Sequence, residues 1–220
     1  MDGKSHLAAG VIFSGIGLMV ANPPLQEVAL PLVIGGISGL APDLDHHNSI
    51  LTKKVSKYVR WLLSVGVSVF MFYIAYQLYI LKFEKEIVFG IVLIGVIASV
   101  LFLSFMKSKN LLLISGLILI LVGLCLLNTI ISVVLLGFFI SIASQLKHRG
   151  LTHSLYSLLF WSVICLNVQM EIGQNNIWLA GTLGYLSHLL TDDWFTRRRI
   201  KWIKTNEVMW LIKKVKRLAN

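Results

Sequence analysis

Long apolar stretches separated by short polar breaks are the feature that most constrains how this chain can fold. Only 14% of its 220 residues are charged, against roughly a quarter in a soluble domain. There is too little polar surface to cover a water-soluble globule, so we expect one compact membrane domain. The stretches are Leu7–Ala21, Val28–Ala41, Val59–Leu81, Ile87–Met106, Leu111–Leu127, Thr129–Leu146, Leu155–Val168 and Ile177–Leu190.

Stretch length decides which segments can cross a bilayer. A full helical span needs about 20 residues, and Val59–Leu81 and Ile87–Met106 meet that length. The two stretches at each end of the chain are shorter, so their polar ends extend them or they enter the bilayer only in part. Backbone groups in lipid must be hydrogen-bonded internally. The sequence therefore predicts an all-α, polytopic transmembrane helix bundle with about eight apolar segments.

The distribution of Lys and Arg predicts the orientation. If the N-terminus is cytoplasmic and all eight stretches cross, every Lys and Arg except Lys82 and Lys85 falls on the cytoplasmic side, out of 20 in the chain. Such a bias is typical of cytoplasmic loops. We therefore expect a multi-pass protein with both termini in the cytoplasm. No removable signal peptide is expected, because Met1 to Leu7 carries charges and no convincing cleavage site follows.

The C-terminal segment has a different pattern. Residues 1–196 form the expected membrane-embedded domain, whereas residues 197–220 combine nine Lys and Arg with apolar residues at helical spacing. This predicts a basic amphipathic cytoplasmic helix on anionic lipid headgroups; the alternative is a solvated helix that caps the bundle. No known motif accompanies the charge, so no nucleic acid partner is expected. The apolar residues are Val208, Leu211, Ile212, Val215 and Leu218.

Four groups of ionisable residues stand at the ends of apolar stretches, where such residues are costly and usually functional. They open the first and seventh stretches and close the second and eighth, so the predicted topology brings all four to the cytoplasmic level. The topology rests on Lys and Arg alone, so this agreement is independent evidence for a shared site. His47 has no such support and is interpreted as a loop residue. The candidate metal ligands are His6, Asp43, Asp45, His46, His148, His153, His188 and Asp192.

The spacing of two pairs is compatible with ligation. His188 and Asp192 are four residues apart, so they share one face of a helix. Asp43 and Asp45 follow Pro42, which disfavours helix for the residue before it. In an extended or turn segment these two carboxylates are expected to point the same way.

The spacing of His148 and His153 requires a turn between them. Five residues on a regular helix separate two side chains by about 140°. Both imidazoles can face one metal centre only if Gly150 lies in a turn, which glycine permits, or if the helix starts after it. Thr152 or Ser154 is then the expected N-cap of the seventh stretch.

Imidazole and carboxylate groups without thiolates suit zinc best, with manganese or iron as alternatives. One tetrahedral zinc needs about four ligands, so eight candidates predict two metal ions, or one ion with a surrounding shell of carboxylates. A divalent metal activates water for hydrolysis, and Asp43 or Asp45 could act as base. Arg149, between two histidines, could hold an anionic oxygen of a phosphate-like substrate.

Each group taken alone has an ordinary explanation. His6 suits the membrane interface, and Asp43 and Asp45 suit a polar turn. His148 with Arg149 suits a positively charged loop, and His188 and Asp192 could simply hydrogen-bond each other near a helix end. Their coincidence on one face favours a metal site. The alternative to an enzyme is a non-enzymatic membrane protein with a structural or regulatory metal site. Transport is disfavoured, because it needs ionisable residues in the middle of spans and these stretches contain almost none.

Four blocks of residues resemble the YdjM-like inner-membrane proteins, a bacterial family described as membrane-bound metal-dependent hydrolases and linked in some species to the LexA-controlled DNA-damage (SOS) response. Together they cover some thirty positions at both ends of the chain. The blocks are Gly3-Lys4-Ser5-His6 with Gly10, Gly39-Leu40-Ala41-Pro42-Asp43-Leu44-Asp45-His46, His148-Arg149-Gly150-Leu151-Thr152-His153-Ser154-Leu155 and Gly184-Tyr185-Leu186-Ser187-His188-Leu189-Leu190-Thr191-Asp192.

The resemblance implies a bacterial cytoplasmic (inner) membrane location and the same eight metal and catalytic positions. A distant similarity of that family to zinc-dependent phospholipase C and related nucleases implies phosphoester hydrolysis, for example of lipid headgroups. Two departures matter. Residues 59–146 include apolar segments that the shortest relatives lack, and Trp194 to Arg199 replace the glycine-containing turn and proline that follow Asp192 in many relatives.

Overall fold

The regular structure is helical throughout the described part of the chain, which comprises residues 3–46, 49–125, 130–196 and 209 of a computed structural model. The predicted all-α helical bundle is confirmed for these residues. The α-helices are α1 Gly3–Ala21, α2 Ala29–Ser38, α3 Ile50–Ile80, α4 Lys85–Phe105, α5 Ser108–Cys125, α6 Ile131–Gln145, α7 Leu155–Ile172 and α8 Ile177–Thr196. Short 3-10 helices are η1 Leu25–Glu27, η2 Ala41–Asp45 and η3 Leu151–His153.

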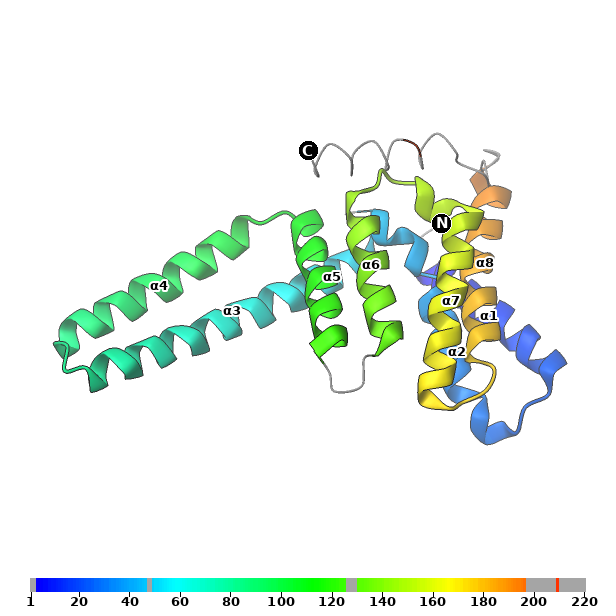
Figure 1. The fold of residues 1–220 in the computed structure, drawn as a ribbon. Helices are drawn as coiled ribbons and strands as arrows, with labels where there is room; N and C mark the ends of the chain where they lie inside the picture. The colour runs from blue at the N-terminus through cyan, green and yellow to red at the C-terminus, as the bar shows by residue number, and fades with distance from the viewer. Residues whose placement is uncertain (1–2, 47–48, 126–129, 197–208, 210–220) are drawn as a thin grey trace.

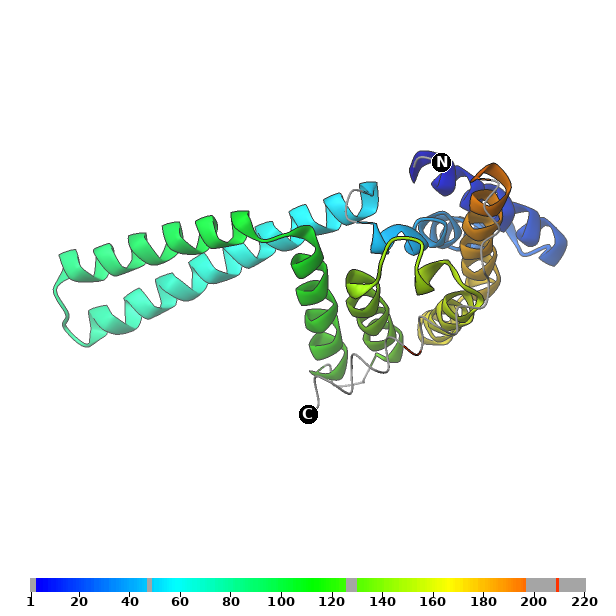
Figure 2. The same cartoon turned by 90° about the horizontal axis from the view of Figure 1, so that it is seen from above.

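Helices α1, α2, α7 and α8 pack into one bundle, and α6 joins it through α7 and η2. Helices α5 to α8 run side by side in Figure 1, and Figure 2 shows the same group from above. The two ends of the chain therefore meet, because α1 packs directly on α8. This contact brings the first and fourth ionisable groups together.

Small residues allow the backbones of α2 and α8 to approach closely. A Cβ on Gly184 would lie 2.0 Å from the carbonyl oxygen of Gly35, so the Gly35 backbone leaves no room for a side chain there. Ser14 on α1 donates a 2.7 Å hydrogen bond to the carbonyl of Ala180 at the same level. Close packing of small residues is a common basis of helix association in lipid, and here it fixes α1, α2 and α8 beneath the ionisable residues.

A buried aromatic group joins this bundle to α6. Phe139 on α6 contacts Trp161 on α7, with ring centroids 5.0 Å apart, and Tyr185 on α8 packs against both. The Trp161 indole donates a 2.9 Å hydrogen bond to Ser38 at the end of α2. Large rings that bury their area and satisfy their polar groups pack stably, so the end of α2 has a fixed position.

Helices α3 and α4 form a hairpin that projects sideways from the bundle (Figures 1 and 2). It is attached at its base, where Arg60 donates a 3.1 Å hydrogen bond to the carbonyl of Met106 and Ser56 contacts that of Ser108 at 3.4 Å. Its outer surface is apolar, with Phe70 and Ile94 more than half exposed. Lipid solvates such a surface without cost.

The start of α3 differs from the prediction. The third apolar stretch was drawn from Val59, but the helix begins at Ile50. Ser49 caps it by accepting a 3.1 Å hydrogen bond from the Thr52 amide, and the lysines that follow are good helix formers. Apolar length marks only the part of a helix that lies in lipid, so the polar first turns were interpreted as loop.

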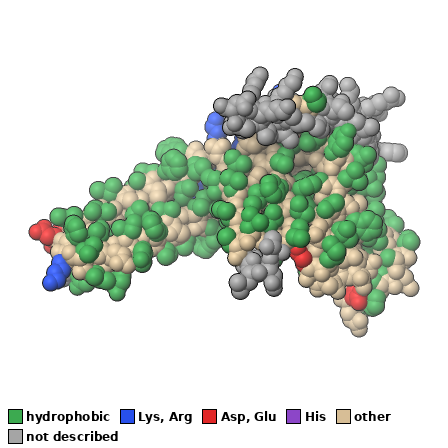
Figure 3. All heavy atoms as spheres, viewed as in Figure 1, with side chains coloured by type: hydrophobic (Ala, Val, Ile, Leu, Met, Phe, Trp, Pro, Cys, Tyr) green, Lys and Arg blue, Asp and Glu red, His purple; other side chains and the backbone are tan. Residues whose placement is uncertain are grey.

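Six helical segments of the described residues are long and apolar enough to cross a membrane. Helix α6 is apolar but shorter, with 15 residues. Hydrophobic side chains cover the flank of the bundle and of the hairpin in Figure 3, and charged side chains gather at the hairpin tip. This distribution agrees with a membrane protein. The six segments are Gly3–Ala21, Leu25–Asp45, Leu51–Ile80, Glu86–Phe105, Ser108–Cys125 and Leu155–Ile172.

Candidate metal centre

Five of the eight predicted ligands converge at one end of the bundle. His6 comes from α1, Asp43 from η2, His153 from η3, and His188 and Asp192 from α8. Their ligand atoms form two overlapping groups, His6 with Asp43 and His188, and His153 with His188 and Asp192, in which all atoms lie within 4.8 Å of one another. Four segments that are distant in sequence thus meet around one point.

The backbone fixes the tautomer of His188. Its Nδ1 lies 2.7 Å from the carbonyl oxygen of Gly39. A carbonyl can only accept a hydrogen bond, so Nδ1 carries the proton and Nε2 of the neutral ring presents a lone pair. The ring is fully buried, so this lone pair points into the centre of the cluster rather than to water.

A carboxylate and a hydroxyl fix the tautomer of His153 in the same way. Its Nδ1 lies 3.1 Å from Thr152 Oγ1 and 3.5 Å from Asp45 Oδ2. Thr152 donates its own hydrogen to Asp45 over 2.5 Å, so its oxygen is left to accept from the ring. Nδ1 is therefore the donor, and Nε2 of His153 also presents a lone pair.

The two lone pairs face each other. His153 Nε2 and His188 Nε2 are 3.2 Å apart, and no hydrogen of either tautomer lies between them. Two buried lone pairs at this distance repel unless a cation, either a proton or a metal ion, lies between them. Ligands around a tetrahedral zinc, with bonds of about 2.0–2.1 Å, are roughly 3.3 Å apart. The spacing of the two nitrogens therefore fits a metal.

Asp192 and His6 complete the same centre. Asp192 Oδ2 lies 3.6 Å from His153 Nε2 and 3.9 Å from His188 Nε2, and Oδ1 lies 3.5 Å from His6 Nε2. The His6 ring stacks on that of His188 at 3.8 Å between centroids, and its Nδ1 is 3.4 Å from Thr191 Oγ1. Nε2 of His6 is thus aimed at the carboxylate, as a ligand would be.

Asp43 and Arg149 form the open side of the cluster. Asp43 Oδ1 lies 3.8 Å from His188 Nε2, and the Asp43 side chain is 16% exposed. The Arg149 side chain is 36% exposed, and its Nη2 lies 3.6 Å from Asp192 Oδ2. Every other ligand side chain of the inner group is at most 5% exposed. A substrate that reaches the cluster must therefore pass these two residues.

The turn that presents Arg149 is closed by Gly150, whose amide donates a 2.8 Å hydrogen bond to the Lys147 carbonyl, and α7 begins after it, as the spacing of His148 and His153 requires. Arg149 itself has the left-handed backbone conformation, with φ of 59°, whereas Gly150 has φ of −76°. A non-glycine residue there costs free energy, and such strained residues cluster at functional sites. Ser154 is the N-cap residue of α7, but it makes no capping hydrogen bond; its hydroxyl donates to the carbonyl of Leu151 over 2.5 Å.

Asp45 lies outside the inner group. It contacts His148 Nδ1 at 3.1 Å as well as Thr152 and His153. Asp43 and Asp45 therefore face different partners, contrary to the expectation that they point the same way. The reason is that η2 is a 3-10 helix, in which residues i and i+2 differ by roughly 240°.

His148 and His46 are peripheral. His46 packs on the His148 ring, with centroids 4.3 Å apart. The His148 side chain is 42% exposed, and its hydrogen bond to Asp45 raises the pKa of its imidazole. The two histidines that were expected to share a metal, His148 and His153, instead share the Asp45 carboxylate.

Several residues of the centre were not predicted. Thr152 positions Asp45 and His153, the Tyr185 hydroxyl donates to the Thr152 carbonyl over 2.5 Å, and the Gly39 carbonyl orients His188. All three stand inside the blocks that carry the family resemblance. Their position inside those blocks could have pointed to them. They were missed because none of the three is a residue type that commonly binds metal.

Other predictions lie outside the described residues. His47 is one, and so is the amphipathic helix predicted within residues 197–220. The side chain of Asp193, for which the sequence suggests solvent exposure or an ion pair with Arg197, also lies outside the described residues.

Comparisons with known proteins agree with the sequence blocks. A sequence model of the family described as YdjM inner membrane protein matches residues 1–204. The match covers all four blocks and every residue of the metal centre, and it confirms the resemblance seen in the sequence. Neither the curated proteins nor the solved structures gave a significant match.

Proposed function

The chain belongs to the YdjM inner membrane protein family, and we propose that it is a membrane-bound metal-dependent hydrolase of phosphoesters. The observation that carries this proposal is the pair of buried lone pairs on His153 and His188, 3.2 Å apart, with their other nitrogens held by hydrogen-bond acceptors. His6, Asp43 and Asp192 add three further ligand groups. Zinc suits this donor set best, with manganese or iron as alternatives.

The residues on the open side have the chemistry for hydrolysis. A divalent metal, when bound, polarises the phosphoryl group and makes water more acidic. Asp43 can accept the proton of the attacking water, because it borders the cluster and is partly exposed. Water oxygen bonds to phosphorus, the phosphorus–oxygen ester bond breaks, and the leaving oxygen takes a proton. Arg149 can hold an anionic oxygen of the substrate through paired N–H donors.

Asp45 is proposed to act indirectly, by orienting His153 and His148. A carboxylate that accepts from the far nitrogen of a ligand histidine fixes the ring and strengthens its donation to a metal. The Thr152 hydrogen bond further restricts the rotation of this carboxylate. Asp45 and Thr152 therefore belong to the site even though neither reaches its centre.

One observation favours the alternative of a structural or regulatory metal site. His6, His153, His188 and Asp192 are almost completely buried, and structural metal sites are typically closed to solvent. The partial exposure of Asp43 and Arg149 favours an enzyme instead. The two functions differ in turnover, not in metal content.

The proposed location of the site is the cytoplasmic face. It is supported by the Lys and Arg distribution, which leaves only Lys82 and Lys85 on the opposite side. Single cysteines at positions 5 and 83 test it with a membrane-impermeant thiol reagent, after Cys125 and Cys165 are replaced by serine. We expect labelling at position 83 and protection at position 5 in intact cells. Labelling at position 5 would reverse the orientation.

Metal analysis tests the site, and a substrate panel tests the activity. Purified wild type in detergent should carry stoichiometric metal, and His188→Ala should lose it. Leu121→Ala on the lipid-facing side of α5 is the matched control and should keep the metal. Wild type without stoichiometric metal would refute the site. Metal without hydrolysis of any phosphodiester or phospholipid would leave the structural alternative.

A further inference from the structure

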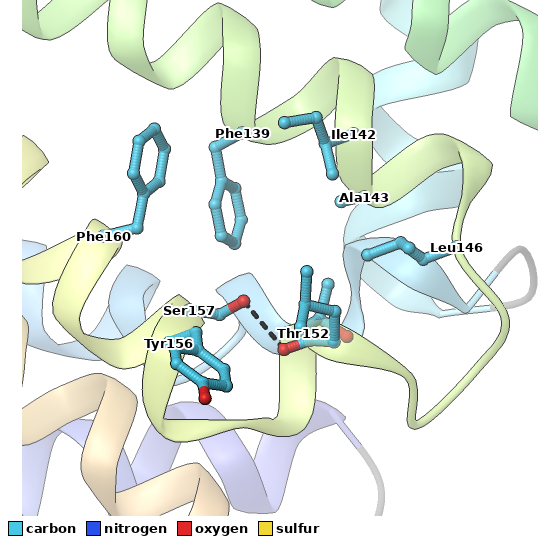
Figure 4. A pocket seen from close by; sticks show the side chains of 9 residues that line it. Phe139, Ile142, Ala143, Leu146, Thr152, Tyr156, Ser157 and Phe160 are labelled. Atoms are coloured by element: carbon cyan, nitrogen blue, oxygen red, sulfur yellow. Dashed lines mark hydrogen bonds between the residues drawn. The ribbon is translucent and has the colours of Figure 1, made fainter. Parts of the chain in front are cut away.

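An apolar cavity lies directly beside the candidate metal centre, between the end of α6, η3 and the start of α7. Its volume is about 220 Å³, too small for a whole drug-sized ligand but enough for part of a flexible chain. Figure 4 shows Phe139 and Phe160 on one side and Leu146 on the other. The lining residues are Phe139, Ile142, Ala143, Leu146, Leu151, Thr152, Tyr156, Ser157 and Phe160.

The hydroxyl groups of Thr152 and Ser157 in the lining are already used within the protein. Thr152 donates its hydroxyl hydrogen to Asp45, and Ser157 donates to the Leu151 carbonyl over 2.8 Å. The cavity therefore offers an apolar surface to whatever enters it. An apolar group that enters the cavity gives up no hydrogen bonds, whereas a polar group would lose its hydrogen bonds to water.

The mouth of the cavity faces the side of the bundle. Ile142 and Tyr156 at its edge are 38% and 44% exposed, whereas Ala143 and Thr152 are buried. Helices α6 and α7 expose further apolar side chains next to it, including Leu159. In a membrane, lipid acyl chains surround this side of the bundle and can reach the mouth of the cavity.

The cavity and the metal centre are joined through η3. Thr152 lines the cavity and hydrogen-bonds Asp45, and the next residue, His153, belongs to the inner ligand group. From Leu146 to Phe139 the cavity wall follows about two turns of α6, roughly 10 Å along the helix. A lipid whose phosphate lies at Arg149 can thus extend a chain along this wall.

We infer that this cavity is an acyl-chain site, so that the substrate of the metal centre is a phospholipid bound by its headgroup at the cluster and by one chain between α6 and α7. The inference rests on the proposed function in one respect: it takes the bound phospholipid to be the substrate that the metal centre hydrolyses. The chain site itself depends only on the cavity and on its opening toward lipid.

Photolabelling tests the chain site without requiring turnover. Purified protein is placed in nanodiscs of phosphatidylethanolamine and phosphatidylglycerol that contain phosphatidylglycerol with a diazirine in mid-chain. Labelled peptides are mapped by mass spectrometry after illumination. We expect labelling concentrated on the α7 residues Tyr156 and Phe160, reduced by excess unlabelled phosphatidylglycerol and unaffected by the water-soluble headgroup glycerophosphoglycerol.

Two variants block the cavity in different ways. Ile142→Trp obstructs the mouth at a partly exposed position that tolerates bulk, and Ala143→Leu fills the buried wall. Each should reduce labelling of α7 several-fold while metal content stays at the wild-type level. Leu121→Trp, at an exposed apolar position on α5 outside the cavity lining, is the control and should label as wild type does.

The outcomes separate the two proposals. Labelling spread evenly over the lipid-facing helices, or unchanged in Ile142→Trp, overturns the chain site. Concentrated labelling in a protein that hydrolyses no lipid keeps the chain site and refutes the proposed activity. Hydrolysis of phospholipid with a KM that Ile142→Trp leaves unchanged keeps the activity and refutes the chain site.

Discussion

Asp45 illustrates how single residues determine the geometry of this centre. Its carboxylate contacts Thr152, His148 and His153 at once and is 0% exposed. A buried carboxylate with three partners has little freedom to rotate, so it transmits its orientation to the His153 ring. Asp43, two residues earlier, makes none of these contacts and borders the opening instead.

Asp45→Asn should lower metal affinity by about 10- to 100-fold without abolishing binding, because the amide keeps the shape but loses the charge that strengthens His153 as a donor. The measurement is competition with a chelating dye of known affinity. His46→Ala is the matched control in the same segment, and its affinity should equal that of wild type. Loss of metal in His46→Ala would add that residue to the ligands, as the sequence prediction had it.

Arg149→Gly separates the guanidinium from the backbone turn that presents it. Glycine adopts the left-handed conformation of Arg149 freely, so the fold and the metal should be retained. Turnover should fall by about 100-fold if the guanidinium stabilises charge in the transition state. The measurement is kcat/KM on a phosphoester that wild type hydrolyses, together with metal content. Unchanged kcat/KM would remove Arg149 from the mechanism.

The sequence predicted which residues meet better than it predicted what each one contacts. His6, His188 and Asp192 were assigned to one site because their helix ends lie on the same side, and the structure brings them together. The division between Asp43 and Asp45 depends on a single 3-10 turn. Apolar patterns do not distinguish such a turn from an extended segment, so that detail could not be predicted.

At the scale of elements, glycines determine whether the ligand-bearing ends can meet. Gly35 and Gly184 place α2 against α8, and Gly10 on α1 has the backbone of Gly39 within 3.3 Å of where its Cβ would be. Three ligand-bearing segments are held together at these contacts. The apolar parts of the helices were predictable from apolar length, but these close approaches were not, because glycine has no side chain to mark them.

Gly184→Ala should therefore destabilise the protein by about 1–3 kcal/mol, because its Cβ would overlap the Gly35 carbonyl and force the helices apart. Metal content should fall with it. Gly66→Ala on α3 is the matched control: its Cβ meets nothing within 4 Å, and alanine is the better helix former. Thermal unfolding in detergent measures both. Equal stability of the two variants would contradict the packing argument.

At the scale of the whole molecule, the proposed metal centre connects segments that the chain keeps far apart. Its ligands come from α1, η2, η3 and α8, whereas the α3–α4 hairpin contributes none of them and contacts the rest of the protein at its base. Binding at the centre should therefore stabilise the bundle and leave the hairpin unaffected.

Removal of metal should lower the midpoint of thermal unfolding. Metal at about 100 times its Kd stabilises the folded state by about 2.7 kcal/mol, which corresponds to roughly 5–10 °C for a chain of this size. Scanning fluorimetry of chelator-treated protein, with and without added zinc, measures the change. The shift should be absent in His188→Ala. An equal shift in that variant would mean that zinc acts elsewhere.

The packing of α1 on α8 also bears on how the protein is made. His6 precedes the other ligands along the chain, and His188 and Asp192 are synthesised only after helices α1 to α7. A nascent chain therefore lacks two of the five inner ligands until α8 has been translated and inserted. Truncated products that stop before α8 cannot assemble the centre, which keeps any reactivity of the metal restricted to chains whose membrane insertion has reached that helix.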